Sequence, residues 1–393
     1  MKRLISLALL GATSSLMALD AEHAYLYKDP RVMGMGGANV AVGGYSTSVF
    51  SNPAGLAKIK KSHGFVVDLL GLGVSVSDKF EDFATDLDDV ETDTDTNPNA
   101  TSDIVKLLKN YSGDHFHFGV DNYTAISKNS DAFAWSLGVL AAADINYKVH
   151  ANGGTSFLET SSRSFGGVIL GGAKPYETDF GRLDVGVSLK YISQISYEGG
   201  LTVNELLDDD VQEKFKDKYE ETSSGFGVDI GATLYPFEDS YWHPAIGFSL
   251  LNIGSMSMDD NYGGQPMTLN VGMSISPDVS IIESLVVAVD YVDALNANQV
   301  RFYNLSGNTV NVEDIDEDDY SKRLRLGVGL GLIDSSFLSM ALNAGMYQGA
   351  YTAGVNLEMT MLKINVATYQ EEIGTGNASN TDRRYIAKLG FGW

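Results

Sequence analysis

The sequence has no cysteine, only 8 prolines in 393 residues, and no long apolar run beyond its first 18 residues. The absence of cysteine excludes a small domain stapled by disulfides. The lack of a long apolar run excludes a spanning helix in the mature chain, because such a helix needs about 20 apolar residues. Cationic charge is scarce, with 27 Lys and Arg against 51 Asp and Glu, so a nucleic acid partner is not expected.

The N-terminus has the pattern of a secretory signal peptide. Met1-Lys2-Arg3 precedes an uncharged apolar stretch, residues 4–17, and small residues follow. We expect cleavage after Ala18, which takes the formal net charge from -24 to -26 because Lys2 and Arg3 are removed. The sequence therefore predicts an exported, strongly acidic protein.

The clearest pattern along the chain is a strict alternation of apolar residues with polar or small ones. Residues 323–332 read RLRLGVGLGL, with five aliphatic side chains on one face and two arginines and three glycines on the other. Residues 70–77, 184–191 and 354–360 alternate in the same way. A soluble sandwich alternates too, but segments of about 10 residues and a glycine-rich polar face favour a transmembrane β-barrel with a crowded lumen.

The C-terminus ends on an aromatic residue of one more alternating segment. Residues 383–393 read RRYIAKLGFGW, which places Tyr385, Leu389, Phe391 and Trp393 on one face. A terminal aromatic of this kind resembles the signal by which barrel-assembly machinery recognises outer-membrane proteins. The alternative is the last strand of a soluble protein that happens to end in tryptophan.

The number and spacing of the alternating segments fit an even-stranded barrel. The connections between them are alternately short and long, as expected for periplasmic turns and extracellular loops. Only 347–349 breaks this order; the long connections are expected at 78–114, 150–161, 198–223, 254–266, 293–321 and 371–383. Fourteen strands are predicted, centred on 65–77, 115–128, 132–149, 162–174, 182–197, 224–235, 242–253, 267–276, 285–292, 322–332, 336–346, 350–360, 362–370 and 384–393.

The long connections carry most of the acidic runs and two candidate amphipathic helices, at 101–110 and 203–219. Residues 93–97 alternate Asp and Thr, but they lack the glycine and the glutamate of an EF-hand loop. A solvated acidic surface is the favoured interpretation of these runs. Loose binding of divalent cations that bridge lipopolysaccharide phosphates is a weaker alternative.

The sequence contains no nucleophile elbow and no zinc-binding helix motif, so neither an enzyme nor a cofactor is expected. His115 and His117 share one strand face, with Phe116 and Phe118 on the other. The two histidines could bind a metal ion, but no third ligand is visible. A polar lumen face opposite an aromatic girdle explains the four residues more simply.

Residues 33–57, MGMGGANVAVGGYSTSVFSNPAGLA, combine many glycines with an Asn-Pro-Ala sequence. A dinucleotide-binding loop would need a third glycine where Asn39 stands, and no βαβ unit surrounds it. We interpret the glycines as sites of tight turning, with Asn52, Pro53 and Ala54 setting a bend.

Residues 31–38 and 48–57 resemble the long-chain fatty acid transporter (FadL) superfamily of outer-membrane proteins, including its PorV-like and TraF-annotated branches. The resemblance implies an all-β fold: a transmembrane antiparallel barrel of about 14 strands with an N-terminal plug segment in the lumen. It divides the chain into a signal peptide (1–18), a plug (19–62) and a barrel with long acidic extracellular loops (63–393). Gly34, Gly36, Gly37, Asn52, Pro53 and Ala54 would then serve the plug and its gating.

The resemblance implies passive uptake of small hydrophobic compounds, fatty-acid-like or aromatic, across the outer membrane of a Gram-negative cell. The acidic loops disfavour docking of anionic fatty acids, because like charges repel. Alternatives are an outer-membrane component that binds partners of a secretion or conjugation apparatus and, more weakly, a general porin. The plug could also be a static seal. Expected partners are outer-membrane lipid and lipopolysaccharide, the barrel-assembly machinery and a small hydrophobic ligand.

Overall fold

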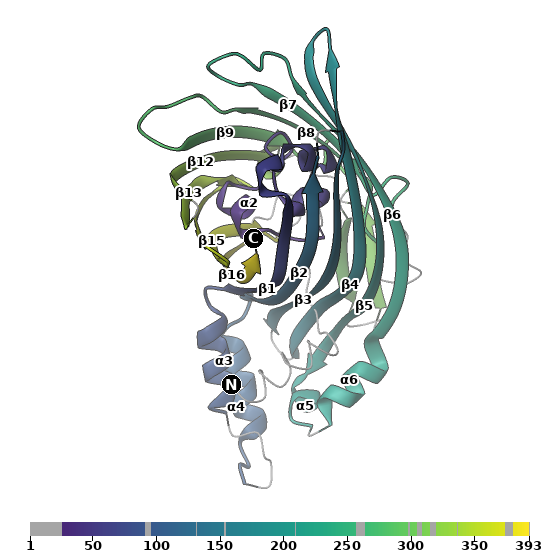
Figure 1. Cartoon of the computed structure of the whole chain (residues 1–393). Helices are drawn as coiled ribbons and strands as arrows, with labels where there is room; N and C mark the ends of the chain where they lie inside the picture. The colour runs from purple at the N-terminus through teal and green to yellow at the C-terminus, as the bar shows by residue number, and fades with distance from the viewer. Residues whose placement is uncertain are drawn as a thin grey trace.

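The computed structural model describes residues 26–392, except 91–95, 131, 153–154, 209, 257–263, 298, 305–308, 315–319, 336 and 374–379. Its main body is one closed antiparallel barrel of fourteen strands (Figure 1). Each strand pairs with its neighbour in sequence, except that β9 pairs with β12, and β1 pairs with β16 to close the ring. The predicted fold class is therefore confirmed for the barrel, with all fourteen predicted segments forming its wall.

The wall is uneven in height. The strands β3, β4 and β5 have 19, 24 and 22 residues, whereas β7, β8 and β9 have only 7 or 8. At about 3.3 Å per residue, the strands of the tall side are roughly 65–80 Å long and those of the low side roughly 25 Å long, measured along strands that tilt against the barrel axis. The barrel strands are β1 (Phe65–Ser77), β2 (His115–Asn129), β3 (Ala134–Asn152), β4 (Thr155–Thr178), β5 (Gly181–Thr202), β6 (Glu220–Tyr235), β7 (Ala245–Leu251), β8 (Thr268–Ile275), β9 (Ser284–Tyr291), β12 (Leu324–Asp334), β13 (Leu338–Tyr347), β14 (Ala350–Met359), β15 (Leu362–Glu372) and β16 (Thr381–Gly392).

Two of the predicted long connections contain strand structure. The expected loop at 150–161 is wrong, because β3 runs to Asn152 and β4 starts at Thr155, and these two residues are paired. The expected loop at 293–321 contains a separate hairpin of β10 (Gln299–Asn304) and β11 (Thr309–Asp314), followed by the short turn η4 (Tyr320–Lys322). The order of short and long connections is therefore less regular than the sequence indicates.

Four helices lie at the end of the barrel that carries the long connections, here called the long-loop end (Figure 1). They are α3 (Phe80–Asp88), α4 (Ala100–Asn110), α5 (Val203–Leu206) and α6 (Val211–Tyr219). The helix predicted at 101–110 is confirmed, the one predicted at 203–219 is divided in two, and α3 was not predicted. Among the described residues, no helix is both long and apolar enough to cross a bilayer.

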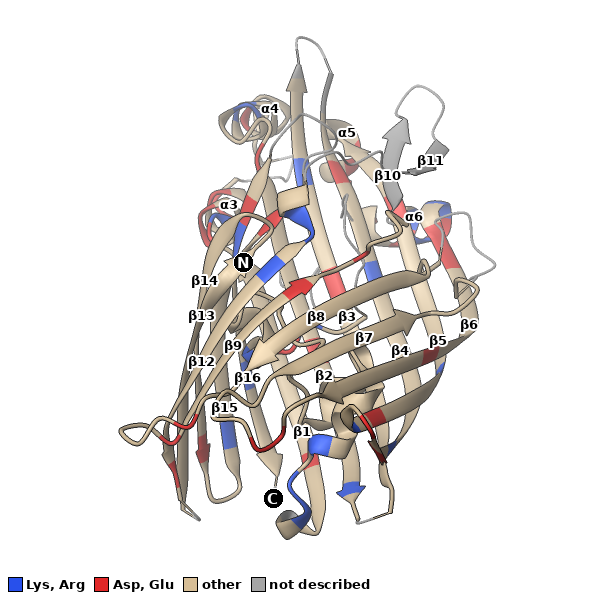
Figure 2. Cartoon of the chain, turned by 90° about the horizontal axis from the view of Figure 1, so that it is seen from above, with Lys and Arg blue, Asp and Glu red and all other residues tan. Residues whose placement is uncertain are grey.

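The outward face of the barrel is apolar near the other end, here called the short-turn end. On β5, Val185, Val187, Leu189 and Tyr191 are each 41–49% exposed, while the alternate residues are buried. Comparable side chains follow the ring through β3, β4, β8 and β16. Charged residues lie mostly on the helices and near strand ends, and the middle of the visible wall is largely uncharged (Figure 2). The predicted alternation therefore separates an apolar outer face from a polar inner one.

Farther toward the long-loop end, the same outward face is covered by helices. Tyr197 and Leu201 share the face of Tyr191, because β4 and β5 pair without a register shift. They are nevertheless buried, in a cluster that contains Phe215 of α6 and Ile104 of α4. The outer halves of β2 to β5 are thus covered on the outside by α3, α4 and α6.

This cover corrects the prediction for Phe116 and Phe118. Phe116 is fully buried and stacks on Phe83 of α3, with 4.1 Å between ring centroids. Phe118 stacks on Phe80 at 5.6 Å. The two rings face outward as expected, but they hold a helix to the wall and do not form an exposed aromatic girdle.

We expect Phe116→Ala to loosen α3 and α4 without opening the barrel. Truncating a buried phenylalanine costs about 3–5 kcal/mol of stability. Here the contacts that are lost are those between β2 and α3. Hydrogen exchange of the α4 amides should accelerate, while exchange in β8 should not change. Phe226→Ala on β6, where the ring is 79% exposed, is the control and should leave both unchanged. Equal protection of α4 in both variants would contradict the assigned packing.

Candidate functional site

The N-terminal part of the described chain, residues 26–64, is here called the inner segment. It contains the helix α2 (Pro30–Gly34) and three short 3₁₀ turns, η1 (Ser46–Phe50), η2 (Pro53–Lys58) and η3 (Lys61–His63). Most of its residues up to Ile59 are buried. Figure 1 shows α2 and the neighbouring turns surrounded by the strands. All six predicted plug residues belong to this segment.

Glycines of the wall let the backbone of the inner segment lie directly against the strands. A Cβ atom added to Gly327 would lie 2.4 Å from the carbonyl oxygen of Met35, and one added to Gly247 would lie 2.4 Å from that of Val40. The Cα atom of Gly354 would lie 3.0 Å from a Cβ on Gly34. Any side chain at these positions would force the two backbones apart. The empty strand face predicted from RLRLGVGLGL is therefore a contact surface.

Gly36 and Gly37 turn the chain after α2. Both have positive φ, 65° and 79°, a conformation that glycine adopts without steric cost. A Cβ on Gly36 would also lie 2.3 Å from the carbonyl oxygen of Leu326. The two residues therefore combine a left-handed turn with close packing.

Asn52, Pro53 and Ala54 form the bend expected from their sequence. The Asn52 side-chain oxygen accepts a hydrogen bond from the Ala54 amide at 3.0 Å, and Pro53 begins η2. The Asn52 amide group donates to the carbonyl of Val40 at 2.7 Å and to the Thr233 hydroxyl of β6 at 3.1 Å. One side chain thus fixes the bend and attaches it to both the inner segment and the wall.

Asp290 of β9 is a second anchor. One of its carboxylate oxygens accepts hydrogen bonds from the amides of Asn39 and Val40, at 2.6 and 2.7 Å. The side chain is fully buried, so these bonds offset part of the cost of burying it, while its other oxygen has no partner among the described residues. Asp290 was not singled out in the sequence. The sequence feature that could have identified it is an acidic residue on the inward face of a predicted strand.

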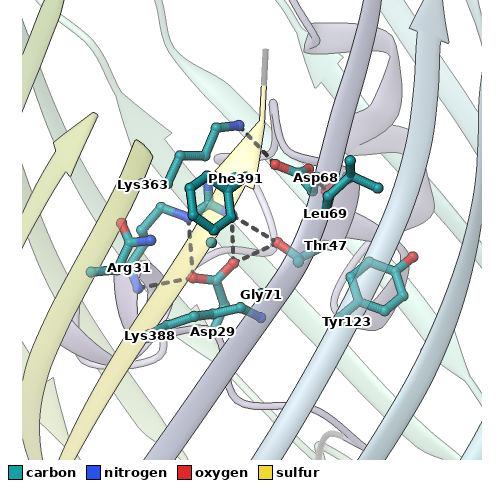
Figure 3. A pocket seen from close by; sticks show the side chains of 13 residues that line it. Asp29, Arg31, Thr47, Asp68, Leu69, Gly71, Tyr123, Lys363, Lys388 and Phe391 are labelled. Atoms are coloured by element: carbon teal, nitrogen blue, oxygen red, sulfur yellow. Dashed lines mark hydrogen bonds and ion pairs between the residues drawn. The ribbon is translucent and has the colours of Figure 1, made fainter. Parts of the chain in front are cut away.

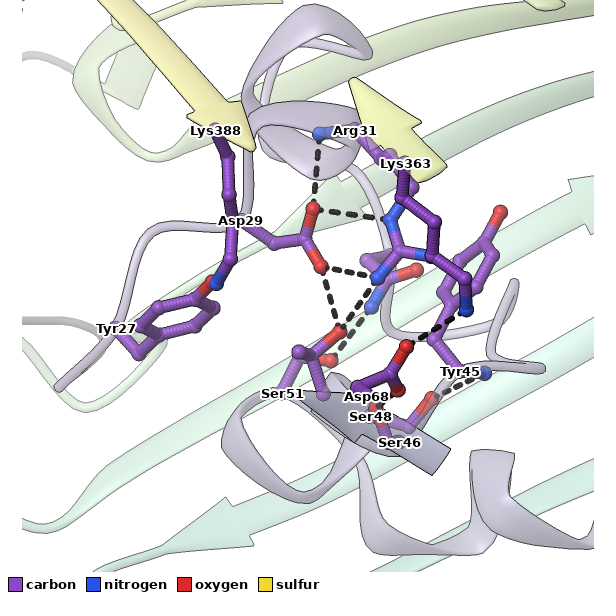
Figure 4. Close-up of polar contacts among 12 residues, drawn as sticks. Tyr27, Asp29, Arg31, Tyr45, Ser46, Ser48, Ser51, Asp68, Lys363 and Lys388 are labelled. Atoms are coloured by element: carbon purple, nitrogen blue, oxygen red, sulfur yellow. Dashed lines mark hydrogen bonds and ion pairs between the residues drawn. The ribbon is translucent and has the colours of Figure 1, made fainter. Parts of the chain in front are cut away.

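Charged residues anchor the start of α2 (Figure 4). Asp29 caps the helix by accepting from the Arg31 amide at 2.9 Å, and it also pairs with the Arg31 guanidinium at 2.6 Å. Burial alone would raise the pKa of Asp29, but Arg31 and the Thr47 hydroxyl outweigh it and hold the pKa below its usual 3.8. Asp68 of β1 accepts from Ser46 and pairs with Lys363 at 2.7 Å.

Apolar side chains meet on one part of the inner wall. Tyr27 and Phe50 of the inner segment pack with Tyr123 of β2, at centroid distances between 4.9 and 5.7 Å. The same buried cluster continues along the inward faces of β3, β4 and β5 through Leu140, Phe165 and Ile192. We call this cluster the apolar strip. It contrasts with a lumen wall that is otherwise rich in Ser, Asn and Asp.

The two histidines considered as metal ligands lie on the inward face. His117 is hydrogen-bonded through both ring nitrogens, to Ser75 at 2.8 Å and to Asn146 at 2.7 Å. Within the described part of the chain, no group of three or more His, Cys, Asp or Glu side chains is placed to hold a metal ion. His117 therefore belongs to a polar network of the lumen wall, whereas the Nε2 atom of His115 is buried without a partner among the described residues.

The C-terminal residues face the outside of the barrel. Tyr385, Leu389 and Phe391 are 49%, 48% and 47% exposed on the outward face of β16. Trp393, the signal-peptide residues 1–18 and the first residues of the predicted plug lie outside the described residues.

Together these features define a closed fourteen-stranded barrel whose lumen contains a segment of its own chain. A sequence profile described as "F plasmid transfer operon, TraF, protein" matches residues 49–264, more than half of the chain. The protein therefore belongs to this TraF family. No curated protein matches the sequence.

Two solved channels are similar in fold. A deletion mutant of the monoaromatic hydrocarbon channel TodX matches with a TM-score of 0.56 and 11% identity, covering 93% of this chain and 98% of its own. The Ralstonia pickettii toluene transporter TbuX matches with a TM-score of 0.50 and 13% identity, covering 93% and 97%. These matches show that the fold is similar, and the TraF profile confirms the TraF-annotated branch of the resemblance.

We expect Gly186→Ala to disturb the Asn52 bend. An added Cβ at Gly186 would lie 2.3 Å from the Ala54 amide nitrogen, so backbone must move. Overpacking of this kind costs about 1–3 kcal/mol, which should lower the thermal unfolding midpoint in detergent and speed proteolysis of the inner segment. Gly166→Ala on β4 is the matched control, because nothing lies within 4 Å of its added Cβ. Indistinguishable behaviour of the two variants would contradict the close approach.

Proposed function

We propose that the protein is an outer-membrane channel for passive uptake of small hydrophobic compounds, aromatic or fatty-acid-like, and that the inner segment is a plug that gates it. The apolar strip is the observation that carries this proposal. A continuous aromatic and aliphatic surface inside a polar lumen offers an apolar solute a favourable path, because burying apolar area releases about 25 cal/mol per Å².

The exposed apolar face supports a membrane location. Outward side chains of β5, from Val185 to Tyr191, could not remain exposed over the whole ring in a monomeric water-soluble protein without inviting association. The aromatic residues at the C-terminus fit insertion by the barrel-assembly machinery. With short turns in the periplasm, the long acidic loops and the helices lie outside the cell.

The geometry of the inner segment supports plugging. Its residues touch β5, β6, β7, β9, β12 and β14 around the ring through the glycine contacts and hydrogen bonds described above. A solute that follows the apolar strip meets Tyr27 and Phe50 of this segment. Passage therefore requires part of the segment to move. In this proposal Gly34, Gly36, Gly37, Asn52, Pro53 and Ala54 hold the closed position.

A disulfide lock tests whether the plug must move. A Cβ on Gly171 of β4 would lie 3.8 Å from the Cβ of Val49 in η1, which is the mean separation in disulfides. The chain has no cysteine, so the double variant Val49→Cys/Gly171→Cys can form only this bond. In a deletion strain, we expect oxidation to reduce uptake of radiolabelled toluene, alkane or fatty acid by about tenfold or more, because the open state is no longer accessible.

Reduction should restore uptake, and the two single-cysteine variants should be insensitive to oxidant. Unchanged uptake with the disulfide fully formed would show that solutes pass without movement of the inner segment and would contradict gating. Wild-type uptake equal to that of the deletion strain for every solute class would contradict transport altogether.

A second candidate is a membrane component of a secretion or conjugation apparatus. It is favoured by the description of the matching family and by the tall side of the wall with its attached helices. Affinity purification from detergent distinguishes the two functions. A stoichiometric apparatus protein favours assembly, whereas a lone barrel with a bound apolar compound favours transport.

A further inference from the structure

The barrel wall is interrupted where β1 passes between β16 and β2. The register of β1 shifts on both sides, between Leu69 and Leu72 against β16 and between Asp68 and Leu72 against β2. Leu70 has a φ of 48°, and its amide donates to the Thr124 hydroxyl at 3.2 Å instead of to a neighbouring backbone. A bulge leaves strand residues unpaired and bends the strand. Here it loosens the wall near the short-turn end.

A cavity of about 430 Å³, open mouth included, lies at this bulge (Figure 3). Its lining combines outward and inward residues. Leu69 and Phe391 are 37% and 47% exposed on the apolar outer face, whereas Asp29 and Thr47 belong to the inner segment. The cavity therefore lies across the wall, between the apolar surface and the buried polar anchors. We call it the seam window.

The polar side of the seam window is lined by both cationic and anionic side chains. Arg31, Lys363 and Lys388 line it together with the carboxylates of Asp29 and Asp68. Each cation has a carboxylate beside it, since Arg31 pairs with Asp29, Lys363 with Asp68, and Lys388 lies 3.5 Å from Asp121. Lys363 and Asp68 are a partly exposed pair at 2.7 Å, with side chains 17% and 21% accessible. Their ammonium and carboxylate groups are therefore reachable from the cavity.

One lining residue lacks a hydrogen-bond partner. The side-chain oxygen of Asn365 on β15 is buried and unpaired among the described residues, and the residue is only 6% exposed. A buried polar atom without a partner costs free energy, so its presence in a cavity points to an occupant that supplies a donor. Asn365 and Lys363 lie two residues apart on the same inward face of β15.

We propose that the seam window binds the head group of one glycerophospholipid from the surrounding leaflet. The phosphate interacts with Lys363, a hydroxyl or ammonium group of the head donates to Asn365, and the acyl chains lie outside along Leu69 and Phe391. Such a lipid seals the interruption in the wall. The proposal rests on the outer-membrane location proposed above, since the short-turn end then lies in the inner, phospholipid leaflet.

The test measures phospholipid retained by the full-length, folded barrel in detergent, by native mass spectrometry during titration with phosphatidylglycerol or phosphatidylethanolamine. We expect one tightly held lipid for the wild type. The double variant Asp68→Asn/Lys363→Gln removes the ion pair without leaving a buried charge unpaired, and should bind about tenfold more weakly. Lys363→Arg keeps the cation and should retain the lipid. Lys128→Gln, at the same end of the barrel but outside the window, should match the wild type.

Three results would overturn the proposal. The double variant could bind phospholipid as tightly as the wild type. Diacylglycerol or oleate could be retained as tightly as the phospholipid, which would make the window an apolar groove. Glycerol phosphate could bind equally well without acyl chains, which would make it a site for a soluble anion. Flotation with phospholipid vesicles measures insertion separately. A protein that inserts but retains no lipid overturns only the proposed lipid site. A protein that does not insert overturns the proposed membrane location as well.

Discussion

The structure depends on the close approach of two backbones, that of the inner segment and that of the barrel wall. Glycines on both sides make this contact possible, as at Gly34 against Gly354 and Met35 against Gly327. Hydrogen bonds then hold the two backbones together: the Asn52 amide group donates to the carbonyl of Val40, and Asp290 accepts from the amides of Asn39 and Val40. A lumen lined by larger side chains would leave no room for the segment, and a looser segment would leave these polar groups unpaired.

The same contact explains which parts of the molecule could be predicted from sequence. Alternation such as RLRLGVGLGL depends only on neighbours in the chain, so the fourteen wall strands were predictable. The Asn52 bend was also predictable, because proline and asparagine act locally. The hydrogen bonds that attach the inner segment to the wall were not predictable. Asn39 and Asp290 are 251 positions apart, and nothing in either local sequence identifies the other. The seam window likewise arises from the register of three strands.

The errors in the sequence interpretation have a physical cause as well. Residues 150–161, which include the end of β3 and the start of β4, were predicted as a loop because their outward residues no longer resemble a lipid-facing strand. Helices cover that face, so its residues need to fit Phe83 or Ile104 and not a bilayer. The hairpin of β10 and β11 was missed because each strand has only six residues, too short for a segment of the wall. A tall, helix-covered side stands next to a low side, so the two proposed functions, transport and assembly, would make use of different parts of the molecule.

The central claim is that the inner segment closes the lumen in the resting protein. Planar-bilayer conductance of the full-length wild-type chain tests it most directly, with insertion verified on the same preparation by recovery of the folded barrel from the membrane. The account predicts inserted barrels with no steady ion current. A stable, ohmic conductance from the wild-type chain would show an open, water-filled pore and would contradict the account.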